Sequence, residues 1–395
     1  MEQRSKTFCV MPHLGMQIQH DGKLYVCNNN DLEFTNKHGE VALVHKDKLG
    51  EVWDSLERRQ IKESLDSGVF HPRCRECQDK EAANLKSQRT FLNGHFEGIE
   101  PSKTQPKVLI IKPGNVCNLA CRMCSPGASS AWYSDAYKLS VKNNTFFGSY
   151  QDYTRTFENE RNGFHINNNN LWDTLTEWIP NTTFLDIYGG EPFLSPGLFS
   201  SLGAAADRNL SQNTSLELST NLTTYNEKYL EILSKYKRVI LKVSLDSHNP
   251  KHLNYIRYPC DPDQLLENLK KFQAYFRQHK NVYIGITLTV TPLNIYYLDE
   301  ITNELSKLTD PIDDYNTVYT PEKYDIRILP REVKLKIIEK IKIDKLTDFL
   351  LQDVDPTGTI FQSFIEETKS LDNYRNQDFR TTFPEFYELI KSYYD

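Results

Sequence analysis

The sequence predicts an α/β protein in three parts: a small cysteine-rich α+β segment over residues 1–100, a parallel α/β core over 101–330 and a helical extension over 331–395. Short apolar stretches alternate with helical patterns through the middle of the chain, which is typical of strands joined by helices. Seven of the eight cysteines lie before residue 125. The last part carries mixed charge at helical spacing.

The composition indicates a folded protein with a polar surface. The 395 residues are 38% hydrophobic, with a mean hydropathy of -0.59 and a net charge of -6. This charge gives no general affinity for polyanions, so we expect no nucleic-acid partner. No apolar run is long enough to span a membrane, and MEQRSKTFCVMPHLG lacks the apolar segment of a signal peptide. We therefore expect a cytoplasmic protein, where cysteines are more often metal ligands than disulfides.

A hairpin is predicted near the start of the chain, between Cys9 and Cys27. Its strands are residues 16–20 and 23–27, and the dipeptide Asp21-Gly22 between them favours a tight turn. Cys9 and Cys27 are therefore expected to meet beside this hairpin.

A helical stretch over residues 49–65 leads to a second pair of thiols, Cys74 and Cys77. Four thiols suit either an all-cysteine zinc site or a fully ligated iron–sulfur cluster, and spacing alone does not choose between them. The polar side chains that follow are expected to form a solvated helix face: Glu81, Ser87 and Arg89.

The first core strand, residues 107–112, leads through a Pro-Gly turn into Cys117-Asn-Leu-Ala-Cys121-Arg-Met-Cys124. Three thiols at this spacing converge only if the backbone curls around one point. Iron–sulfur clusters are normally held by four cysteines, so three leave one iron open for chemistry. The alternative is a zinc site, but no histidine nearby completes a tetrahedron.

The second strand, residues 184–188, ends in Gly189-Gly190-Glu191-Pro192. Glycines permit close backbone approach, and the strand's carboxyl end is where barrel active sites lie. An ammonium group is the natural partner of the Glu191 carboxylate.

Four more strands are expected over residues 215–218, 239–246, 282–290 and 324–329. Each of the first three ends in or leads to polar residues. Ser244 and Asp246 share one strand face, and Asp246 is expected to be a structural cap rather than a general base. Arg257 suits either a carboxylate ligand or a surface ion pair. The remaining candidates are Ser219 and Asn221 after the third strand and Asn294, a predicted helix cap, after the fifth.

Helices are expected between and after these strands, over 128–139, 171–179, 196–210, 227–236, 263–278, 331–351, 361–371 and 384–394. Residues 140–170 are predicted to be an insertion that forms a surface loop or lid. The C-terminal helices carry no chemical motif and are expected to cover a face of the core.

The stretch CNLACRMC resembles the signature of the radical S-adenosylmethionine (SAM) superfamily, and the GGEP and Ser/Thr-Asn elements follow in that family's order. The resemblance implies a partial TIM-like (β/α)6 barrel. It also implies a [4Fe-4S] cluster on Cys117, Cys121 and Cys124. The other residues implied to contact SAM are Gly189, Gly190, Glu191 and Pro192 at the amine, Ser219 and Asn221 at the methionine or ribose, Ser244 and Arg257 at the carboxylate, and Asn294 near the adenosine.

The N-terminal cysteines, with Gly22 and Trp53, are similar to the half-SPASM or twitch module of the same superfamily. That module carries an auxiliary [4Fe-4S] cluster, here implied on Cys9, Cys27, Cys74 and Cys77. It usually follows the barrel, whereas in this chain it precedes it.

The resemblance implies that an electron from a donor such as flavodoxin or ferredoxin splits SAM. The 5′-deoxyadenosyl radical so formed takes hydrogen from a substrate. A peptide or protein substrate, modified or oxidised, is the first expectation. The alternative is dehydrogenation or rearrangement of a small carbohydrate or nucleotide. A hypothesis from another class is a zinc-binding, cysteine-rich interaction protein.

Overall fold

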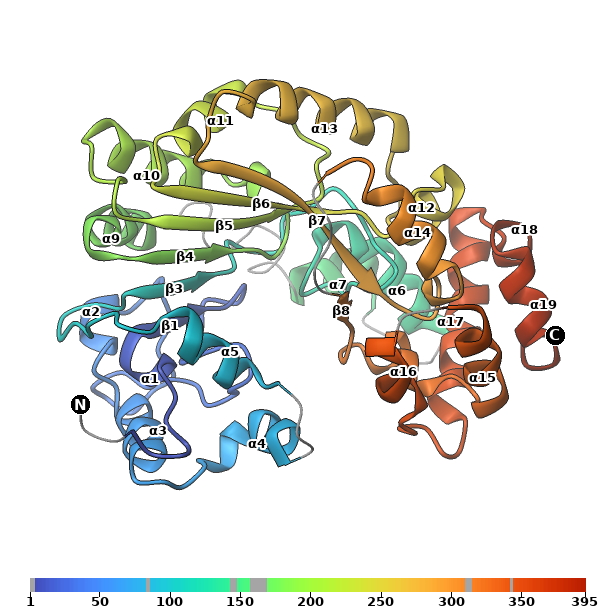
Figure 1. Cartoon of the computed structure of the whole chain (residues 1–395), viewed down its shortest axis with the longest axis horizontal. Helices are drawn as coiled ribbons and strands as arrows, with labels where there is room; N and C mark the ends of the chain where they lie inside the picture. Colours follow the sequence, from blue (N-terminus) through green and yellow to red (C-terminus); the bar gives the residue numbers. More distant parts are fainter. Residues whose placement is uncertain (1–3, 83–85, 143–147, 157–168, 310–314, 342–343) are drawn as a thin grey trace.

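A computed structural model describes residues 4–82, 86–142, 148–156, 169–309, 315–341 and 344–395. One eight-stranded sheet, in the order β2-β1-β3-β4-β5-β6-β7-β8, runs through the molecule (Figure 1). From β3 to β8 the strands are parallel and in chain order, which confirms the predicted partial (β/α)6 barrel. The strands are β1 (Gly15–Ile18), β2 (Leu24–Tyr25), β3 (Val108–Ile111), β4 (Phe184–Ile187), β5 (Ser215–Thr220), β6 (Arg238–Ser244), β7 (Val282–Val290) and β8 (Tyr315–Thr317).

The prediction for the sixth barrel strand is wrong. β8 lies at Tyr315–Thr317, and residues 324–329 instead hold two 3-10 turns, η6 (Glu322–Tyr324) and η7 (Ile326–Ile328). Alternate apolar residues suggested a strand, but the Asp325 carboxylate accepts the backbone N–H of Arg327 at 2.9 Å and starts a turn.

The predicted N-terminal hairpin is present, and it extends the barrel sheet. Gly22 takes the left-handed conformation in the turn (φ 84°). β1 pairs antiparallel with β2 and parallel with β3, so that Ile18 stands opposite Ile111. The sheet therefore continues from the cysteine-rich segment into the barrel.

Helices of the cysteine-rich segment, which we call the N-terminal module (residues 4–100), gather below β1 and β3 in Figure 1. They are α1 (Met11–Leu14), α2 (Leu49–Val52), α3 (Leu56–Asp66), η1 (Pro72–Cys74), α4 (Arg75–Ala82) and α5 (Gln88–His95).

Helices α9, α10, α11 and α13 lie along one face of the sheet (Figure 1). Of the insertion predicted over 140–170, residues 143–147 and 157–168 lie outside the described chain. The barrel helices are η2 (Ser130–Trp132), α6 (Tyr133–Lys142), α7 (Tyr150–Thr156), α9 (Asn169–Trp178), η3 (Ile179–Asn181), η4 (Pro192–Leu194), α10 (Pro196–Asp207), α11 (Glu227–Ser234), α12 (Pro250–Ile256), α13 (Pro262–Phe276), η5 (Ile295–Tyr297) and α14 (Leu298–Leu305).

The C-terminal helices pack at the β8 end of the sheet, away from the N-terminal module (Figure 1). They are α15 (Arg331–Lys340), α16 (Asp344–Leu351), α17 (Thr359–Arg375), α18 (Phe379–Thr382) and α19 (Pro384–Tyr394). α17 contacts α6, which follows the CNLACRMC loop after η2.

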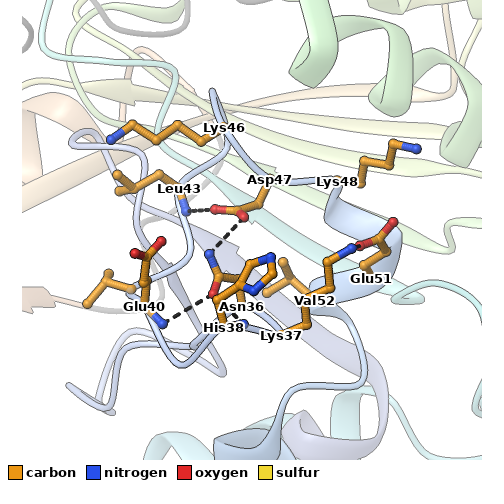
Figure 2. Close-up of a pocket in the computed structure, with 11 residues that line it drawn as sticks. Asn36, Lys37, His38, Glu40, Leu43, Lys46, Asp47, Lys48, Glu51 and Val52 are labelled. Carbon is orange, nitrogen blue, oxygen red and sulfur yellow. Dashed lines mark hydrogen bonds and ion pairs between the residues drawn. The ribbon is translucent and has the colours of Figure 1, made fainter.

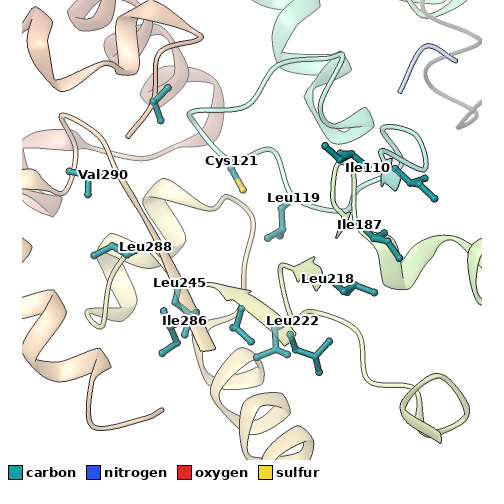
Figure 3. Packing of buried hydrophobic residues seen from close by; sticks show 14 of the residues in the cluster. Ile110, Leu119, Cys121, Ile187, Leu218, Leu222, Leu245, Ile286, Leu288 and Val290 are labelled. Carbon is teal, nitrogen blue, oxygen red and sulfur yellow. The ribbon is translucent and has the colours of Figure 1, made fainter. Parts of the chain in front are cut away.

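The barrel strands alternate between two kinds of side chain. Leu185, Leu216 and Leu241 are fully buried, whereas the intervening Asp186 and Glu217 are half-buried. Period-two alternation places the two sets on opposite faces of the sheet. Apolar residues at the strand ends also gather around the CNLACRMC loop, where Cys121 lies in the core (Figure 3).

Candidate functional site

The three cysteines of CNLACRMC act on one another. Burial raises the pKa of Cys117 to about 12, and the neighbouring Cys121 thiolate adds to this rise. A hydrogen bond between the Cys121 and Cys124 thiols lowers the pKa of Cys121 and raises that of Cys124. Thiolates buried this close together repel one another and need a cation, and metal coordination deprotonates a thiol outright. The donor set thus fits a thiolate-bound iron–sulfur cluster.

The loop backbone is held from several sides. The N–H of Ala120 donates to the Tyr258 carbonyl at 2.5 Å, and that of Arg122 donates to Ile256 at 2.8 Å. The indole N–H of Trp132 donates to the Cys121 carbonyl at 2.7 Å. These contacts hold the curl that the spacing requires.

The GGEP segment packs directly on this loop. Gly190 has φ 57°, and a Cβ built there would lie 2.7 Å from the Val116 carbonyl oxygen and 2.9 Å from that of Gly114. The N–H of Glu191 donates to the same Val116 carbonyl at 2.8 Å. Only glycine permits this approach, which brings Glu191 close enough to Cys117 for its charge to act on that thiol.

The Glu191 carboxylate is buried and oriented. It accepts hydrogen bonds from Asn221 N (2.7 Å), Thr220 Oγ1 (2.8 Å) and Phe193 N (3.1 Å). Burial nevertheless raises the pKa of Glu191 to about 7, because these donors only partly offset the loss of solvent. A positively charged or strongly donating ligand would complete the site.

Replacing Glu191 by glutamine should weaken SAM binding by about tenfold, the effect of losing one charge-assisted hydrogen bond. Equilibrium binding of SAM to the anaerobically reconstituted enzyme measures this. Glu57→Gln is the matched control, since the Glu57 carboxylate also accepts a backbone N–H and a threonine hydroxyl, both from Thr35. Equal losses in both variants would contradict the assignment.

The predicted Ser/Thr-Asn element lies beside Glu191. Asn221 Nδ2 points to Cys117 Sγ at 3.6 Å. Thr220, which the sequence reasoning missed, binds Glu191 directly. Ser219 stands opposite Lys242 on the neighbouring strand, and Ser244 opposite Thr287. The role of Thr220 depends on Glu191, which lies 29 residues earlier in the chain, in the segment after β4.

Arg257 is not on the surface. Its Nε lies 2.7 Å from Asp246 Oδ2, and its Nη1 is 3.9 Å from Cys121 Sγ. Burial alone would lower the pKa of Arg257, but the Asp246 carboxylate raises it overall. The surface ion pair that the sequence left open is thus replaced by a buried pair at the thiols, and Asp246 serves as its anion.

Asn294 is buried, but its side chain makes no cap hydrogen bond to the following turn. Its Nδ2 donates to the carbonyls of Asp246 (3.1 Å) and Thr289 (2.8 Å). The predicted cap is therefore wrong, and Asn294 ties the end of β7 to the segment after β6.

The half-buried face of the barrel strands carries paired charges. Lys242 forms an ion pair with Glu217, and Asp186 stands opposite Glu217 on the next strand. Burial raises the pKa of Asp186 to about 6; Lys242 opposes this rise and Glu217 adds to it. Asp186 on this face therefore stays protonated to a higher pH than an ordinary aspartate.

Asp186→Asn should stabilise the protein at neutral pH. Because folded Asp186 keeps its proton to a higher pH than the unfolded chain, the wild type loses stability as pH rises from about 4 to 6. The variant should gain about 2 kcal/mol at pH 7.5, and the gain should shrink toward pH 5. Anaerobic urea denaturation measures it, with the exposed Asp207→Asn as control. A gain that does not depend on pH would contradict the explanation.

The four cysteines of the N-terminal module, Cys9, Cys27, Cys74 and Cys77, line one small cavity. Burial, together with the charges of Cys77 and Cys74, raises the pKa of Cys9 to about 12. Among the described residues, no group of three or more His, Cys, Asp or Glu is close enough to hold a single metal ion.

Arg89 also lines this cavity, and the expectation of a solvated helix face is wrong for Arg89 and Ser87, which are both buried. Arg89 forms an ion pair with Glu81 and donates to the Phe8 carbonyl beside Cys9. Ser87 caps α5 through a reciprocal hydrogen bond with Thr90. Buried polar residues that follow the pair Cys74 and Cys77 thus support the segment that carries these cysteines.

Two contacts join the N-terminal module to the barrel site. The Tyr188 hydroxyl, just before the GGEP glycines, donates to Asn28 Oδ1 at 2.5 Å. A Cβ built on Gly127 would lie 3.0 Å from His20 Nε2. Asn28, next to Cys27, and Gly127, three residues after Cys124, therefore each lie where the N-terminal module meets the barrel.

A separate groove lies within the module (Figure 2). It surrounds a loop in which Asp47 accepts hydrogen bonds from Leu43 N (2.8 Å) and Asn36 Nδ2 (3.1 Å). No cysteine lines it, and its polar groups serve the loop itself, so we assign it no chemistry.

Together these observations define an α/β protein with two buried, thiol-lined centres. The model of the radical SAM superfamily matches residues 111–305, and that of the SPASM iron–sulfur cluster-binding domain matches residues 9–78. The chain therefore belongs to the radical SAM superfamily, in the subgroup with SPASM-type domains. Its cofactors are [4Fe-4S] clusters and SAM.

Solved structures give weaker similarity. Native anSMEcpe with bound AdoMet is 17% identical, with a TM-score of 0.34 over 69% of this chain and 62% of that chain. SuiB of Streptococcus suis bound to S-adenosylmethionine is 15% identical, with a TM-score of 0.33 over 88% and 71%. The chain thus spans about 62% of the length of anSMEcpe. Curated proteins give no match.

Among the described residues, no helix is both long and apolar enough to cross a bilayer.

Proposed function

We propose that the SAM-binding [4Fe-4S] cluster is held by Cys117, Cys121 and Cys124, and an auxiliary [4Fe-4S] cluster by Cys9, Cys27, Cys74 and Cys77. The observation that carries the first assignment is the hydrogen bond between Cys121 and Cys124, with Cys117 close enough to feel the charges of both Cys121 and the oriented Glu191 carboxylate. When bound, the cluster supplies the electron that splits SAM into methionine and a 5′-deoxyadenosyl radical. Flavodoxin or ferredoxin is the proposed electron donor.

The chain's own residues would orient SAM. Glu191 accepts a hydrogen bond from the amine, with Gly189, Gly190 and Pro192 shaping the approach. The buried charge of Arg257, with Ser244, favours the SAM carboxylate. Ser219 and Asn221 serve the methionine or the ribose, and Asn294 lies near the adenosine. Packing around Cys121 excludes water from the same point.

A peptide or protein is the proposed substrate, which the enzyme modifies or oxidises. The SPASM-type match and the row of charged side chains on the half-buried face of the barrel strands support a polar substrate of this kind. With four thiols available, the auxiliary cluster would accept an electron from the substrate rather than bind the substrate.

Anaerobic reconstitution tests the proposal. We expect about eight iron and eight sulfide per chain, as two four-iron clusters require, and 5′-deoxyadenosine when SAM and dithionite are added. A colourless protein with zinc and no SAM cleavage would reject it and favour the zinc-binding interaction protein instead.

A further inference from the structure

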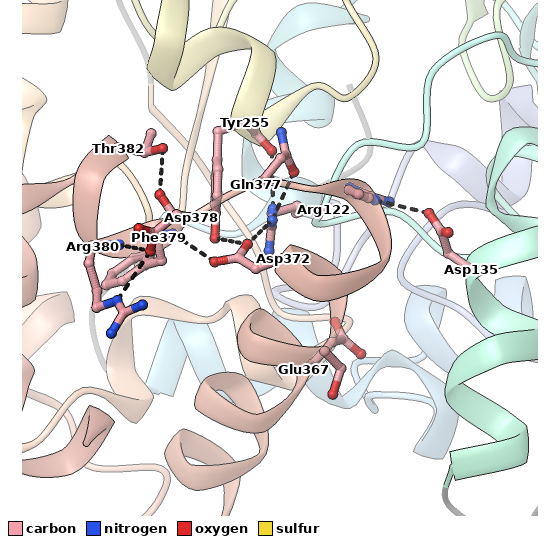
Figure 4. A network of polar contacts seen from close by, with 12 residues as sticks. Arg122, Asp135, Tyr255, Glu367, Asp372, Gln377, Asp378, Phe379, Arg380 and Thr382 are labelled. Atoms are coloured by element: carbon pink, nitrogen blue, oxygen red, sulfur yellow. Dashed lines mark hydrogen bonds and ion pairs between the residues drawn. The ribbon is translucent and has the colours of Figure 1, made fainter.

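The C-terminal extension reaches into the CNLACRMC motif. Arg122, between Cys121 and Cys124, has a fully buried side chain. Its Nη2 donates to Asp372 Oδ1 at 2.5 Å and to Gln377 Oε1 at 2.9 Å (Figure 4). Asp372 lies on α17 and Gln377 just after it. A motif residue is therefore anchored by a segment about 250 residues later in the chain.

A second arginine on α17 holds the backbone of the same loop. Arg375 Nη2 donates to the Ala120 carbonyl at 2.8 Å, and its Nε donates to Asp135 at 2.9 Å. Its guanidinium also lies over the ring of Trp132, the residue that binds the Cys121 carbonyl. Both peptide units around Cys121 are thus held, directly or through Trp132, from α17.

Three buried arginines belong to or contact the loop that carries Cys121, and each has one carboxylate partner: Arg122 with Asp372, Arg375 with Asp135 and Arg257 with Asp246. The Arg257 guanidinium lies 3.9 Å from Cys121 Sγ, and the Arg375 guanidinium lies 2.8 Å from the carbonyl of the preceding residue, Ala120. Charge in a buried site acts strongly because little solvent screens it. A change in the charge of one of these pairs therefore changes the electrostatic potential at any group bound to the Cys121 sulfur.

We propose that Asp372 and Arg375 of α17 are positioning residues of the SAM-binding cluster and set its reduction potential. The inference rests on the proposed function. Reduction adds negative charge to the cluster, and net charge near a cluster tunes its potential. Removing the Asp372 carboxylate leaves Arg122 unbalanced and favours the reduced state. Removing the Arg375 guanidinium leaves Asp135 unbalanced and disfavours it.

Potentiometry followed by electron paramagnetic resonance tests the inference on the full-length, reconstituted enzyme. SAM addition identifies the signal of the cluster with an open iron, since SAM perturbs that signal alone. We expect Asp372→Asn to raise the potential of this cluster and Arg375→Met to lower it. Arg375→Lys, which keeps the charge, should stay near the wild type. Glu366→Gln, an exposed charge removal on the same helix, should leave the potential unchanged.

Shifts of opposite sign separate a charge effect from simple disturbance of the fold, which would lower cluster content in both variants alike. If Asp372→Asn fails to fold, because its amide faces the Phe379 N–H, the two Arg375 variants decide. Unchanged potentials, or equal potentials for Arg375→Met and Arg375→Lys, would overturn the inference while leaving SAM cleavage intact. A wild type without clusters would instead reject the proposed function.

Discussion

Cys121→Ala should abolish SAM cleavage and remove about four of the eight expected iron atoms. Two remaining thiols cannot hold the cluster, whereas the cavity of the N-terminal module, with its own four cysteines, is untouched. Iron and sulfide analysis, together with assay of 5′-deoxyadenosine, measures both effects. The remaining iron should still give the visible absorption of one cluster.

Cys260→Ala is the matched control for this variant. Cys260 is also buried and lies in the same apolar core as Cys121, so both variants remove a buried thiol of equal size. The control should keep about eight iron and its cleavage activity. Loss of iron in both variants, or full cleavage by Cys121→Ala, would remove Cys121 from the proposed site.

Gly190→Ala should lower SAM affinity by more than a hundredfold. The new Cβ would meet the Val116 and Gly114 carbonyls at 2.7 and 2.9 Å, and φ 57° strains any residue with a side chain. Because both contacts are backbone atoms of the loop before Cys117, the loop and Glu191 must move apart. Strain and displacement together should cost about 2–4 kcal/mol of stability.

SAM binding and the denaturation midpoint, both measured anaerobically, test this prediction. Gly285→Ala is the control, because a Cβ at Gly285 meets no heavy atom within 4 Å. It should bind SAM like the wild type. If Gly190→Ala also binds SAM normally, the GGEP segment does not approach the loop as described.

Local patterns were enough to predict most of the barrel. The strands over 184–187 and 282–290 stand out because an apolar or β-branched run is bounded by turn residues, and each of these signals lies within a few neighbours. The hairpin before Cys27 is predictable for the same reason, since Asp21-Gly22 specifies its turn.

Long-range polar contacts could not be predicted. Arg122 and Asp372 are far apart in the chain, and the sequence around each predicts an ordinary exposed charge. The fold nevertheless buries both as an ion pair. The same holds for Arg89, whose burial depends on Glu81 and the Phe8 carbonyl. The strand prediction for residues 324–329 failed for a different reason. Alternating apolar side chains fit both a strand and consecutive tight turns, and the hydrogen bond from Arg327 N to the Asp325 side chain decides for the turns.

Both borders of the barrel sheet are short. β2 has two residues and β8 has three, so in the described chain each border exposes few unpaired backbone groups. An open sheet with long, flat borders offers a template on which other chains can add strands and aggregate. In the part of the chain that the structure describes, the sheet does not close on itself, yet its brief terminal strands should protect it from edge-to-edge association during expression and storage.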